Sequence, residues 1–247
     1  LSQKTFFYNA TDATKIPLRQ KPVKVEKEKP QAKKRGRPKK GETREPIKPT
    51  ILKQQKELLS VEEKLALVST ECGVGIKQNS KGNREVWIGG KLHISAVDGD
   101  IPVTAFYSGA NIHDSSIALP LIQETSKRVN YLYDLQDAGY DADIIREFSN
   151  KLGHRPIIDT NPKNSKELKA KIELMEHEGK TFKDINQHLN CDEEHYNQRS
   201  MVERVNKYLK DDFGCDKIYY QGATKVASVL AFGILSICIH QSLQLVT

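Results

Sequence analysis

The sequence lacks the features of a disulfide-stapled, zinc-binding or exported protein. Its cysteines are scattered and form no Cys-x-x-Cys pair; they are Cys72, Cys191, Cys215 and Cys238. We therefore expect a reduced protein without a disulfide framework. Cys191-x3-His195 has a zinc-like spacing but no second half, so no zinc site is predicted. The N-terminus shows no apolar core followed by a small-residue cleavage site, and no signal peptide is expected.

Long apolar runs are also missing. The most hydrophobic segment, residues 226–239, is too short to span a bilayer and ends in His240-Gln241. We interpret it as a buried helix. The first residue is Leu1, not Met, which suggests a truncated or decayed copy of a longer reading frame. A cytoplasmic protein is expected.

Positive charge is concentrated in the first quarter of the chain. Residues 1–60 carry 17 Lys/Arg against 6 Asp/Glu, whereas residues 61–247 carry 22 against 26. The first segment also holds six of the ten prolines and few aliphatic residues, a composition that buries too little apolar surface to offset the cost of ordering. We predict a mostly disordered basic arm over 1–60 and a globular domain over 61–247. Phosphate backbone is the usual partner of such an arm.

Residues 33–40 (Lys-Lys-Arg-Gly-Arg-Pro-Lys-Lys) form the most basic part of the arm. Arg35, Gly36 and Arg37 resemble the core of an AT-hook, which binds the narrow minor groove of A·T-rich DNA. Gly36 has no side chain to clash with the groove floor, and the arginines meet its negative potential. A generic basic linker is the alternative interpretation.

Hydrophobic periodicity in residues 61–247 predicts alternating strands and helices. Ser60 and Glu63 form a capping box for a short first helix. The later expected elements are strands at 86–97, 101–107, 131–136 and 156–159, helices at 116–128 and 142–152, and a polar, helical insertion at about 161–195. Antiparallel strands followed by a crossover indicate a mixed α/β layer architecture.

A single helix is predicted from Tyr196 to Phe213, because the segment contains no Gly or Pro and Gly214 follows it. At about 100° per residue, Tyr196, Arg199, Glu203 and Lys210 fall on one polar stripe, opposite an apolar face. Taken alone, this stripe is more typical of the solvated face of an amphipathic helix.

The stripe resembles the Tyr-x2-Arg-x3-Glu-x6-Lys pattern around the last catalytic Glu of DDE transposases from bacterial insertion sequences. Upstream motifs in the family's order extend the resemblance over nearly all of residues 60–247. They are Gly-x-Lys-Leu-His within 87–93, Asn-x-His-Asp at 111–114, and Asp-x-Gly-Tyr at 137–140. The resemblance implies a ribonuclease-H-like mixed sheet flanked by helices.

The family's chemistry is metal-dependent cleavage and transfer of DNA strands. The resemblance implies that Asp137 and Glu203 bind two Mg²⁺ or Mn²⁺ ions, since carboxylate oxygens are the hard ligands such ions prefer. Arg199 and Lys210 would bind DNA phosphates, and Tyr196 would stack or hydrogen-bond nearby. The implied partners are double-stranded DNA, as transposon ends and target, and a second copy in a synaptic complex at the bacterial nucleoid.

The first catalytic Asp is not found where the resemblance leads us to expect it, in a segment like Cys-Asp-x-Gly-x-Lys. Residues 72–77 match that segment but have Gly73 in place of the Asp. Glu71, two residues away on the same face of a strand, is a candidate replacement. The sequence thus predicts a catalytically impaired transposase. A non-catalytic DNA-binding remnant and a host-type nuclease on the same fold are the alternatives.

Other acidic residues have structural explanations at this stage. Asp98 and Asp100 flank Gly99 in a predicted hairpin turn. Asp114 precedes a predicted helix, where it is expected to cap the first turn.

Overall fold

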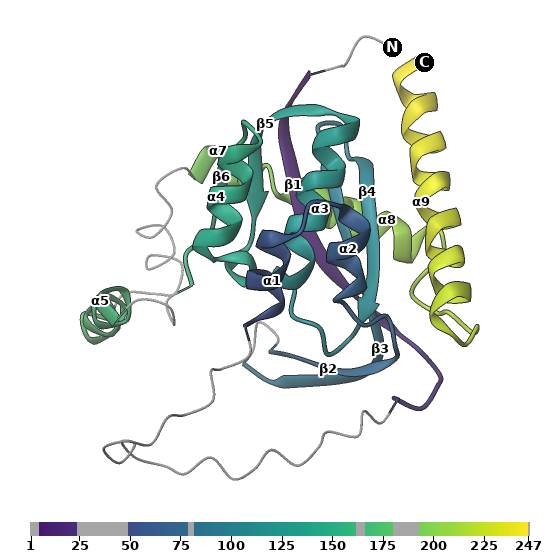
Figure 1. The fold of residues 1–247 in the computed structure, drawn as a ribbon, viewed down its shortest axis with the longest axis horizontal. Helices are drawn as coiled ribbons and strands as arrows, with labels where there is room; N and C mark the ends of the chain where they lie inside the picture. Colours follow the sequence, from purple (N-terminus) through teal and green to yellow (C-terminus); the bar gives the residue numbers. More distant parts are fainter. Residues whose placement is uncertain (1–4, 24–48, 79–81, 162–165, 180–192, 247) are drawn as a thin grey trace.

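A six-stranded mixed sheet runs through the middle of the molecule (Figure 1). The computed structural model describes residues 5–23, 49–78, 82–161, 166–179 and 193–246. The strands are β1 (Thr5–Pro17), β2 (Gly73–Gln78), β3 (Arg84–Val97), β4 (Ile101–Gly109), β5 (Asn130–Gln136) and β6 (Arg155–Ile158). The order is β2-β3-β1-β5-β6, with β4 also paired to β3. β3 pairs antiparallel with β1, β2 and β4, whereas β5 pairs parallel with β1 and β6.

The central strand β1 comes from the segment predicted to be disordered, and that prediction is wrong for residues 5–17. The local sequence explains why. Thr5-Phe-Phe-Tyr8 begins a run of good strand formers, and Ala10 and Ile16 are completely buried. Averaging the composition over sixty residues hid this run behind the lysines and prolines that follow it. Residues 33–40, with Arg35, Gly36 and Arg37, lie outside the described part of the chain.

Helices cover both faces of the sheet (Figure 1). On one face lie α1 (Ile51–Glu57), α2 (Val61–Ala66), α3 (Ser115–Arg128) and α4 (Asp143–Lys151). The predicted capping box at Ser60 and Glu63 is present at the start of α2. α1 also falls within the predicted arm, so the boundary at residue 60 does not separate disorder from fold. The predicted fold class, a ribonuclease-H-like mixed sheet flanked by helices, is confirmed.

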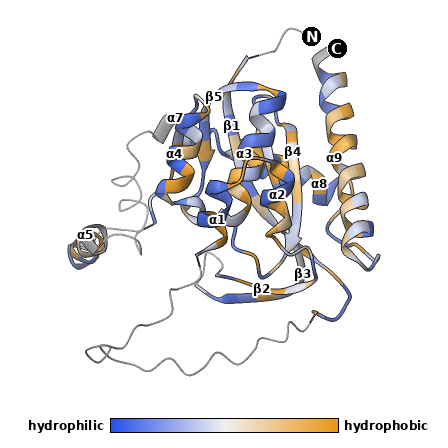
Figure 2. Cartoon of the chain, viewed as in Figure 1, coloured by the Kyte–Doolittle hydropathy of each residue, from blue (hydrophilic) through white to orange (hydrophobic). Residues whose placement is uncertain are grey.

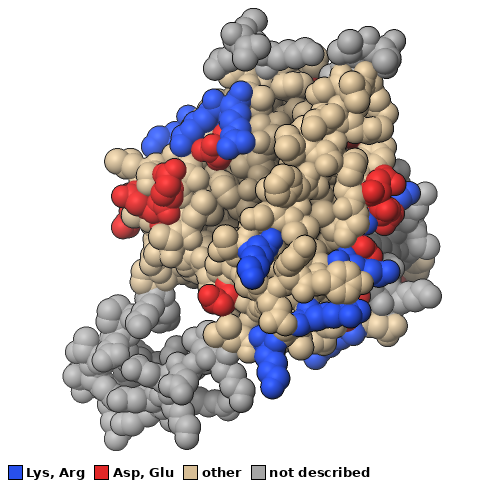
Figure 3. Space-filling model, turned by 90° about the vertical axis from the view of Figure 1, so that its right-hand side faces the viewer, with Lys and Arg blue, Asp and Glu red and all other residues tan. Residues whose placement is uncertain are grey.

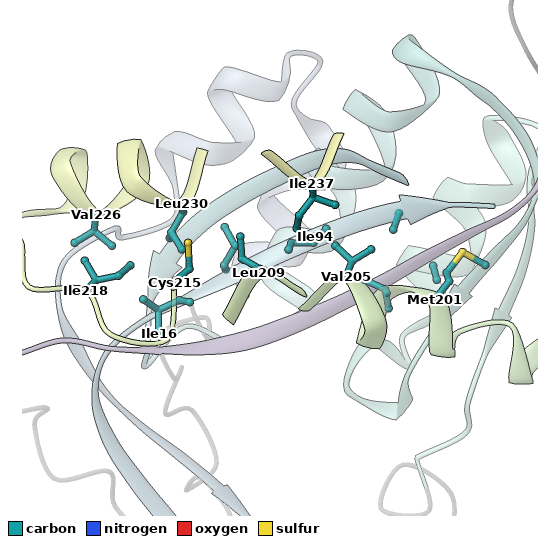
Figure 4. Packing of buried hydrophobic residues seen from close by; sticks show 14 of the residues in the cluster. Ile16, Ile94, Met201, Val205, Leu209, Cys215, Ile218, Val226, Leu230 and Ile237 are labelled. Atoms are coloured by element: carbon teal, nitrogen blue, oxygen red, sulfur yellow. The ribbon is translucent and has the colours of Figure 1, made fainter. Parts of the chain in front are cut away.

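The other face is covered by α8 (Ser200–Asp211) and α9 (Ala223–Val246). Their buried side chains join those of β1 and β3 in the largest apolar cluster (Figure 4). At Gly233, a Cβ atom would lie 2.6 Å from Cys215 Sγ and 2.7 Å from Leu209 Cδ1. This glycine therefore allows α9 to pack closely on α8. Figure 2 shows apolar residues along much of α9, including its outer side.

Two predictions about the C-terminal helices need correction. The expected single helix over 196–213 is divided into α7 (Glu193–Asn197) and α8, with Gln198 and Arg199 in the turn between them. The expected buried helix over 226–239 is longer, at 24 residues, and is buried on one face only. Within the described residues, α9 is the one helix long and apolar enough to cross a membrane. Its inner face lies in the protein core instead.

Two further elements complete the described chain. They are the 3-10 turn η1 (Ala138–Tyr140), directly after β5, and α5 (Lys166–His177), which lies within the predicted helical insertion. The middle of that insertion, residues 180–192, lies outside the described residues.

Candidate active site

The side chain of Asp12 lies in the middle of β1 on the face covered by α8. Ala10 and Ile16 belong to the apolar cluster on this face, and alternate residues of a strand share a face. Asp12 thus points the same way as these two residues. Asn206 of α8 donates a hydrogen bond from Nδ2 to Asp12 Oδ2 over 2.9 Å. The carboxylate is thereby fixed between the central strand and the helix.

Asp137 lies beside Asp12 because of the parallel pairing of β1 with β5. Thr11 is paired with Gln136, so the residues that follow each of them come out at the same end of the sheet. β5 stops at Gln136, and Asp137 turns into η1, where its Oδ1 accepts a hydrogen bond from the Gly139 amide over 2.9 Å. That bond leaves the other carboxylate oxygen for a further partner.

Burial disfavours the ionised form of both carboxylates. Desolvation raises the pKa of Asp12 from its ordinary 3.8 to about 6, with the charge of Asp137 adding to the rise and that of Arg199 opposing it. Desolvation also raises the pKa of Asp137, and the charge of Asp114 adds to it. A nearby cation would favour the charged form of these partly buried carboxylates.

Arg199 supplies a cation at this place. It lies in the turn between α7 and α8, and its Nη1 is 3.7 Å from Asp12 Oδ1. Its Nη2 forms an ion pair with Glu203, one helical turn later. The guanidinium carbon also lies 5.7 Å from the centre of the Tyr196 ring. Burial lowers the pKa of Arg199, but the acidic groups around it, Asp137 included, raise it above its usual value.

The predicted residues Tyr196, Arg199, Glu203 and Asp137 are thus gathered around one guanidinium group. Glu203 is about half exposed at 54% and reaches the group from the solvent side. Burial raises the pKa of Tyr196 to about 12, so its hydroxyl remains protonated and can donate a hydrogen bond.

Lys210, the fourth residue of the predicted stripe, belongs to a group of lysines beside the carboxylates. Burial lowers the pKa of Lys210, and so do the positive charges of Lys15 on β1 and Lys77 on β2. Glu85 on β3 forms an ion pair with Lys15 and is the cross-strand neighbour of Lys77. Lys77 also acts on the charges of Asp12 and Asp137. Three cations from three elements therefore adjoin the acidic site.

Sequence reasoning missed three residues of this site, Asp12, Asn206 and Asp159. Asp12 was hidden because residues 1–60 were treated as one segment. The signal that identifies it is local: strand formers alternate on both sides of a single acid. Asp159 follows β6, and burial raises its pKa, with a further contribution from the charge of Asp137. It adds a carboxylate at the same end of the sheet, where β5 and β6 both terminate.

The predicted position of the first carboxylate at residue 73 is wrong, because Gly73 begins the edge strand β2 and the first strand of the sheet is β1. A Cβ atom on Gly73 would lie 2.2 Å from Asn111 Oδ1, so an aspartate there would displace the Asn111 side chain. Glu71 lies beside Gly109 at the end of β4, and β3 separates β4 from β1. The reason for proposing Glu71 as a replacement ligand therefore disappears.

The other acidic residues lie in structural contacts. Asp98 and Asp100 flank the β3–β4 turn as predicted, and the Asp98 carboxylate accepts a hydrogen bond from the Phe7 amide over 2.7 Å. Asp100 forms an ion pair with Arg204 over 2.6 Å. Asp114 stands at the start of α3 but makes no capping hydrogen bond. It forms an ion pair with Lys91 over 2.8 Å instead.

Within the described residues, no three His, Cys, Asp or Glu side chains lie close enough together to hold a metal ion. Arg199 contacts Asp12 and Glu203 and holds a positive charge beside Asp137. It stands in for a cation, and the donor set around it is of the hard carboxylate type that divalent ions prefer. A metal site here would require the guanidinium to move aside and the carboxylates to converge.

Comparison with protein-family models identifies the family of this chain. The family model described as the transposase DDE domain matches residues 10–239. The chain belongs to this family. The match begins within β1 and so includes Asp12, and it ends within α9. No curated protein and no solved structure matches the chain.

Membership in the family gives the transposase domain its general function. Such domains bind DNA, cut and join its phosphodiester backbone, and use divalent metal ions. Asp137 lies directly after β5 and Glu203 lies on α8.

Proposed function

We propose that this chain is a metal-dependent DNA transposase whose acidic triad is Asp12, Asp137 and Glu203. The observation that carries the proposal is the pair of partly buried carboxylates, Asp12 on β1 and Asp137 directly after β5, with Arg199 between them and Glu203. Without a function, such a pair would be a costly feature, because burial raises the pKa of both groups.

Two Mg²⁺ or Mn²⁺ ions are the proposed cofactors, held by these three residues. When bound, they supply activation of a water or a 3′-hydroxyl and neutralise the leaving oxygen. The protein's part is orientation. Asn206 holds one oxygen of Asp12 and the Gly139 amide holds one oxygen of Asp137, so that each carboxylate keeps its other oxygen for a metal ion.

DNA phosphates are the proposed partners of the cations beside the triad. Lys15, Lys77 and Lys210 present three positive charges from separate elements, and Arg199 becomes available for a phosphate once it leaves the carboxylates. Tyr196 is proposed to hydrogen-bond or stack near the cleaved strand. The basic segment with Arg35, Gly36 and Arg37 is proposed to add sequence-tolerant affinity for duplex DNA.

Asp12 changes the expectation that this copy is impaired. The carboxylate that seemed to be missing at residue 73 is supplied from β1, so we propose an active enzyme. The proposed setting is the bacterial cytoplasm at the nucleoid, where two chains would join two transposon ends in a synaptic complex. The alternative is a DNA-binding remnant without catalysis; the shielding of the acids by Arg199 is the observation in its favour.

The test uses a DNA fragment that carries the inverted repeats flanking the gene, incubated with the full chain and Mg²⁺ or Mn²⁺. We expect nicks at the repeat ends, and their loss in Asp137→Asn and in Glu203→Gln. A matched control is Asp216→Asn, which changes an exposed carboxylate beyond α8. Retarded DNA without any nick, in both metals, would favour the remnant over the enzyme.

A further inference from the structure

Tyr8 and Tyr133 form a matched pair of aromatic side chains on neighbouring parallel strands. The two residues are partners in the register of β1 and β5, and their rings stack with centres 5.6 Å apart. Each lies four residues before a carboxylate of the proposed site, Tyr8 before Asp12 and Tyr133 before Asp137. Both rings pack against the apolar cluster under α8. The tyrosine pair and Asp12 therefore share one face of the sheet.

His195 of α7 contacts both tyrosines. Its ring stacks on that of Tyr133, with centres 4.4 Å apart and planes inclined by 22°. Its Nδ1 shares a hydrogen bond with the Tyr8 hydroxyl over 2.8 Å. The stack and the hydrogen bond together fix both the position and the orientation of the imidazole. Since α7 is only five residues long, it depends on such tertiary contacts to stay on the sheet.

Arg199 follows His195 by one helical turn. Backbone hydrogen bonds connect the two: the Gln198 amide donates to the His195 carbonyl over 3.1 Å, and the Arg199 amide to the Tyr196 carbonyl over 2.9 Å. The segment thus contacts the sheet at two places, the tyrosine pair through His195 and Asp12 through Arg199. A movement of His195 away from the tyrosines would therefore displace Arg199 as well.

The contact of α7 with the tyrosines can open without exposing the core. The side chains of Tyr8, Tyr133 and His195 are all partly exposed. In contrast, α8 is held by completely or almost completely buried apolar side chains, among them Val202 and Val205. α7 can therefore leave the sheet while α8 stays in place.

We propose that His195 is a positioning residue that keeps the proposed metal site closed. While its imidazole lies on the tyrosine pair, the Arg199 guanidinium stays against Asp12. When α7 leaves the sheet, the guanidinium moves away with it, and the carboxylate becomes free for a metal ion. The inference rests on the proposed function in that the metal site is the one proposed above.

The first experiment contains neither metal nor DNA, so its failure is separate from a failure of the proposed function. The full chain is treated with phenylglyoxal, which modifies accessible guanidinium groups, and peptide mass spectrometry follows each arginine. The Arg199 side chain is 19% exposed in the closed site. In His195→Ala its modification should be at least about threefold faster, because a ring stack and a hydrogen bond are lost. Tyr8→Phe, which removes the hydroxyl but keeps the ring, should give a smaller increase.

Two controls separate a movement of α7 from a general loosening of the fold. Arg204 on α8 pairs with Asp100 and is half exposed, so its modification rate should be the same in every variant. His240→Ala removes an exposed histidine from α9 and should leave the Arg199 rate unchanged. α9 lies at the right of Figure 1 and α7 at the left, and Figure 3 shows the α9 side. Circular dichroism checks that each variant is folded.

An Arg199 rate in His195→Ala equal to that of the wild type would overturn the proposal. Equal increases at Arg199 and Arg204 would also overturn it, because they would show that α8 loosens together with α7.

Calorimetric titration with Mn²⁺ tests the consequence for the metal site. His195→Ala should bind Mn²⁺ more tightly than the wild type, as Arg199→Ala should. Combined with Arg199→Ala, the histidine substitution should add nothing, because no guanidinium is left to position. Additive gains would assign His195 an effect of its own and contradict the positioning role. A chain that binds no Mn²⁺ in any variant would count against the proposed function, whereas faster modification of Arg199 would support the positioning role in that case as well.

Discussion

Asp12 and Arg199 lie 3.7 Å apart, carboxylate oxygen to guanidinium nitrogen, although they come from opposite ends of the chain. The contact joins the central strand to the turn before α8. It also brings a permanent positive charge to the place where we propose that divalent ions bind. Whether this contact opens when metal and DNA bind decides how the site works, and two predictions follow from it.

Removal of the Arg199 guanidinium should change the affinities for metal and for DNA in opposite directions. In Arg199→Ala, Asp12 and Glu203 lose the cation that neutralises them, so Mn²⁺ should bind more tightly than to the wild-type chain. DNA should bind less tightly, because a phosphate contact is lost. Isothermal titration with Mn²⁺ and a gel-retardation series with DNA measure the two effects.

Arg204→Ala is the matched control for Arg199→Ala. Arg204 lies on α8 and pairs with Asp100 at the β3–β4 turn, so its loss should leave Mn²⁺ affinity unchanged. Weaker Mn²⁺ binding in Arg199→Ala than in Arg204→Ala would mean that the guanidinium helps to hold the metal rather than standing in for it.

Asp12→Asn should stabilise the metal-free fold at neutral pH. Because burial raises the pKa of Asp12 to about 6 from 3.8, its favourable contribution is fully present below pH 3.8 and is lost as the pH rises through about 6. The asparagine cannot ionise and avoids this loss. The shift corresponds to a gain on the order of 3 kcal/mol at pH 7.5.

Urea denaturation in EDTA at pH 7.5 and at pH 4 measures this difference in the free energy of unfolding. The gain should be present at pH 7.5 and nearly absent at pH 4, where the aspartate is largely protonated in the folded chain. A difference of the same size at both pH values would assign the effect to packing and not to charge.

Aspartate at position 73 should destabilise the protein instead of repairing it. A Cβ atom there would lie 2.2 Å from Asn111 Oδ1, and such overpacking costs typically about 1–3 kcal/mol. Ile76→Asp, on the same strand with a side chain that is 66% exposed, is the control for the added charge. A thermal midpoint for Gly73→Asp at or above that of Ile76→Asp would contradict the steric argument.

Lys77→Ala should weaken DNA binding and flatten its dependence on salt. Each phosphate contact contributes about −0.9 to the slope of log affinity against log salt concentration, so the slope should fall in magnitude by about one. Lys53→Ala changes an exposed lysine on α1, on the other side of the sheet, and should alter the slope less. Equal slopes for the two variants would remove Lys77 from the proposed DNA contact.

Much of the fold was predictable because its signals are local. The alternation in β3 and β4, the Gly99 turn between them and the capping box at Ser60 all depend on neighbouring residues. Asp137 and Glu203 could be found for the same reason, since each stands in a short motif. Asp12 has no such motif around it, and its role depends on pairing between β1 and β5, which joins residues distant in sequence.

The corrected helix predictions have the same cause, because they too depend on contacts between residues distant in sequence. No Gly or Pro predicts the break between α7 and α8 at Arg199. The break coincides with the contact of Arg199 with Asp12. The half-exposed state of α9 was hidden because apolar residues occur on all sides of the helix. Periodicity then gives no buried face, and only the packing of Gly233 against Leu209 reveals which side turns inward.

The most direct test of the account is calorimetric Mn²⁺ binding to the wild-type chain, Asp12→Asn and Glu71→Gln. If Asp12 supplies the first carboxylate, its loss should weaken Mn²⁺ binding by about tenfold or more, because second-shell losses alone cost that much, while Glu71→Gln should bind as the wild type does. Unchanged affinity in Asp12→Asn, together with a loss in Glu71→Gln, would contradict the proposed site.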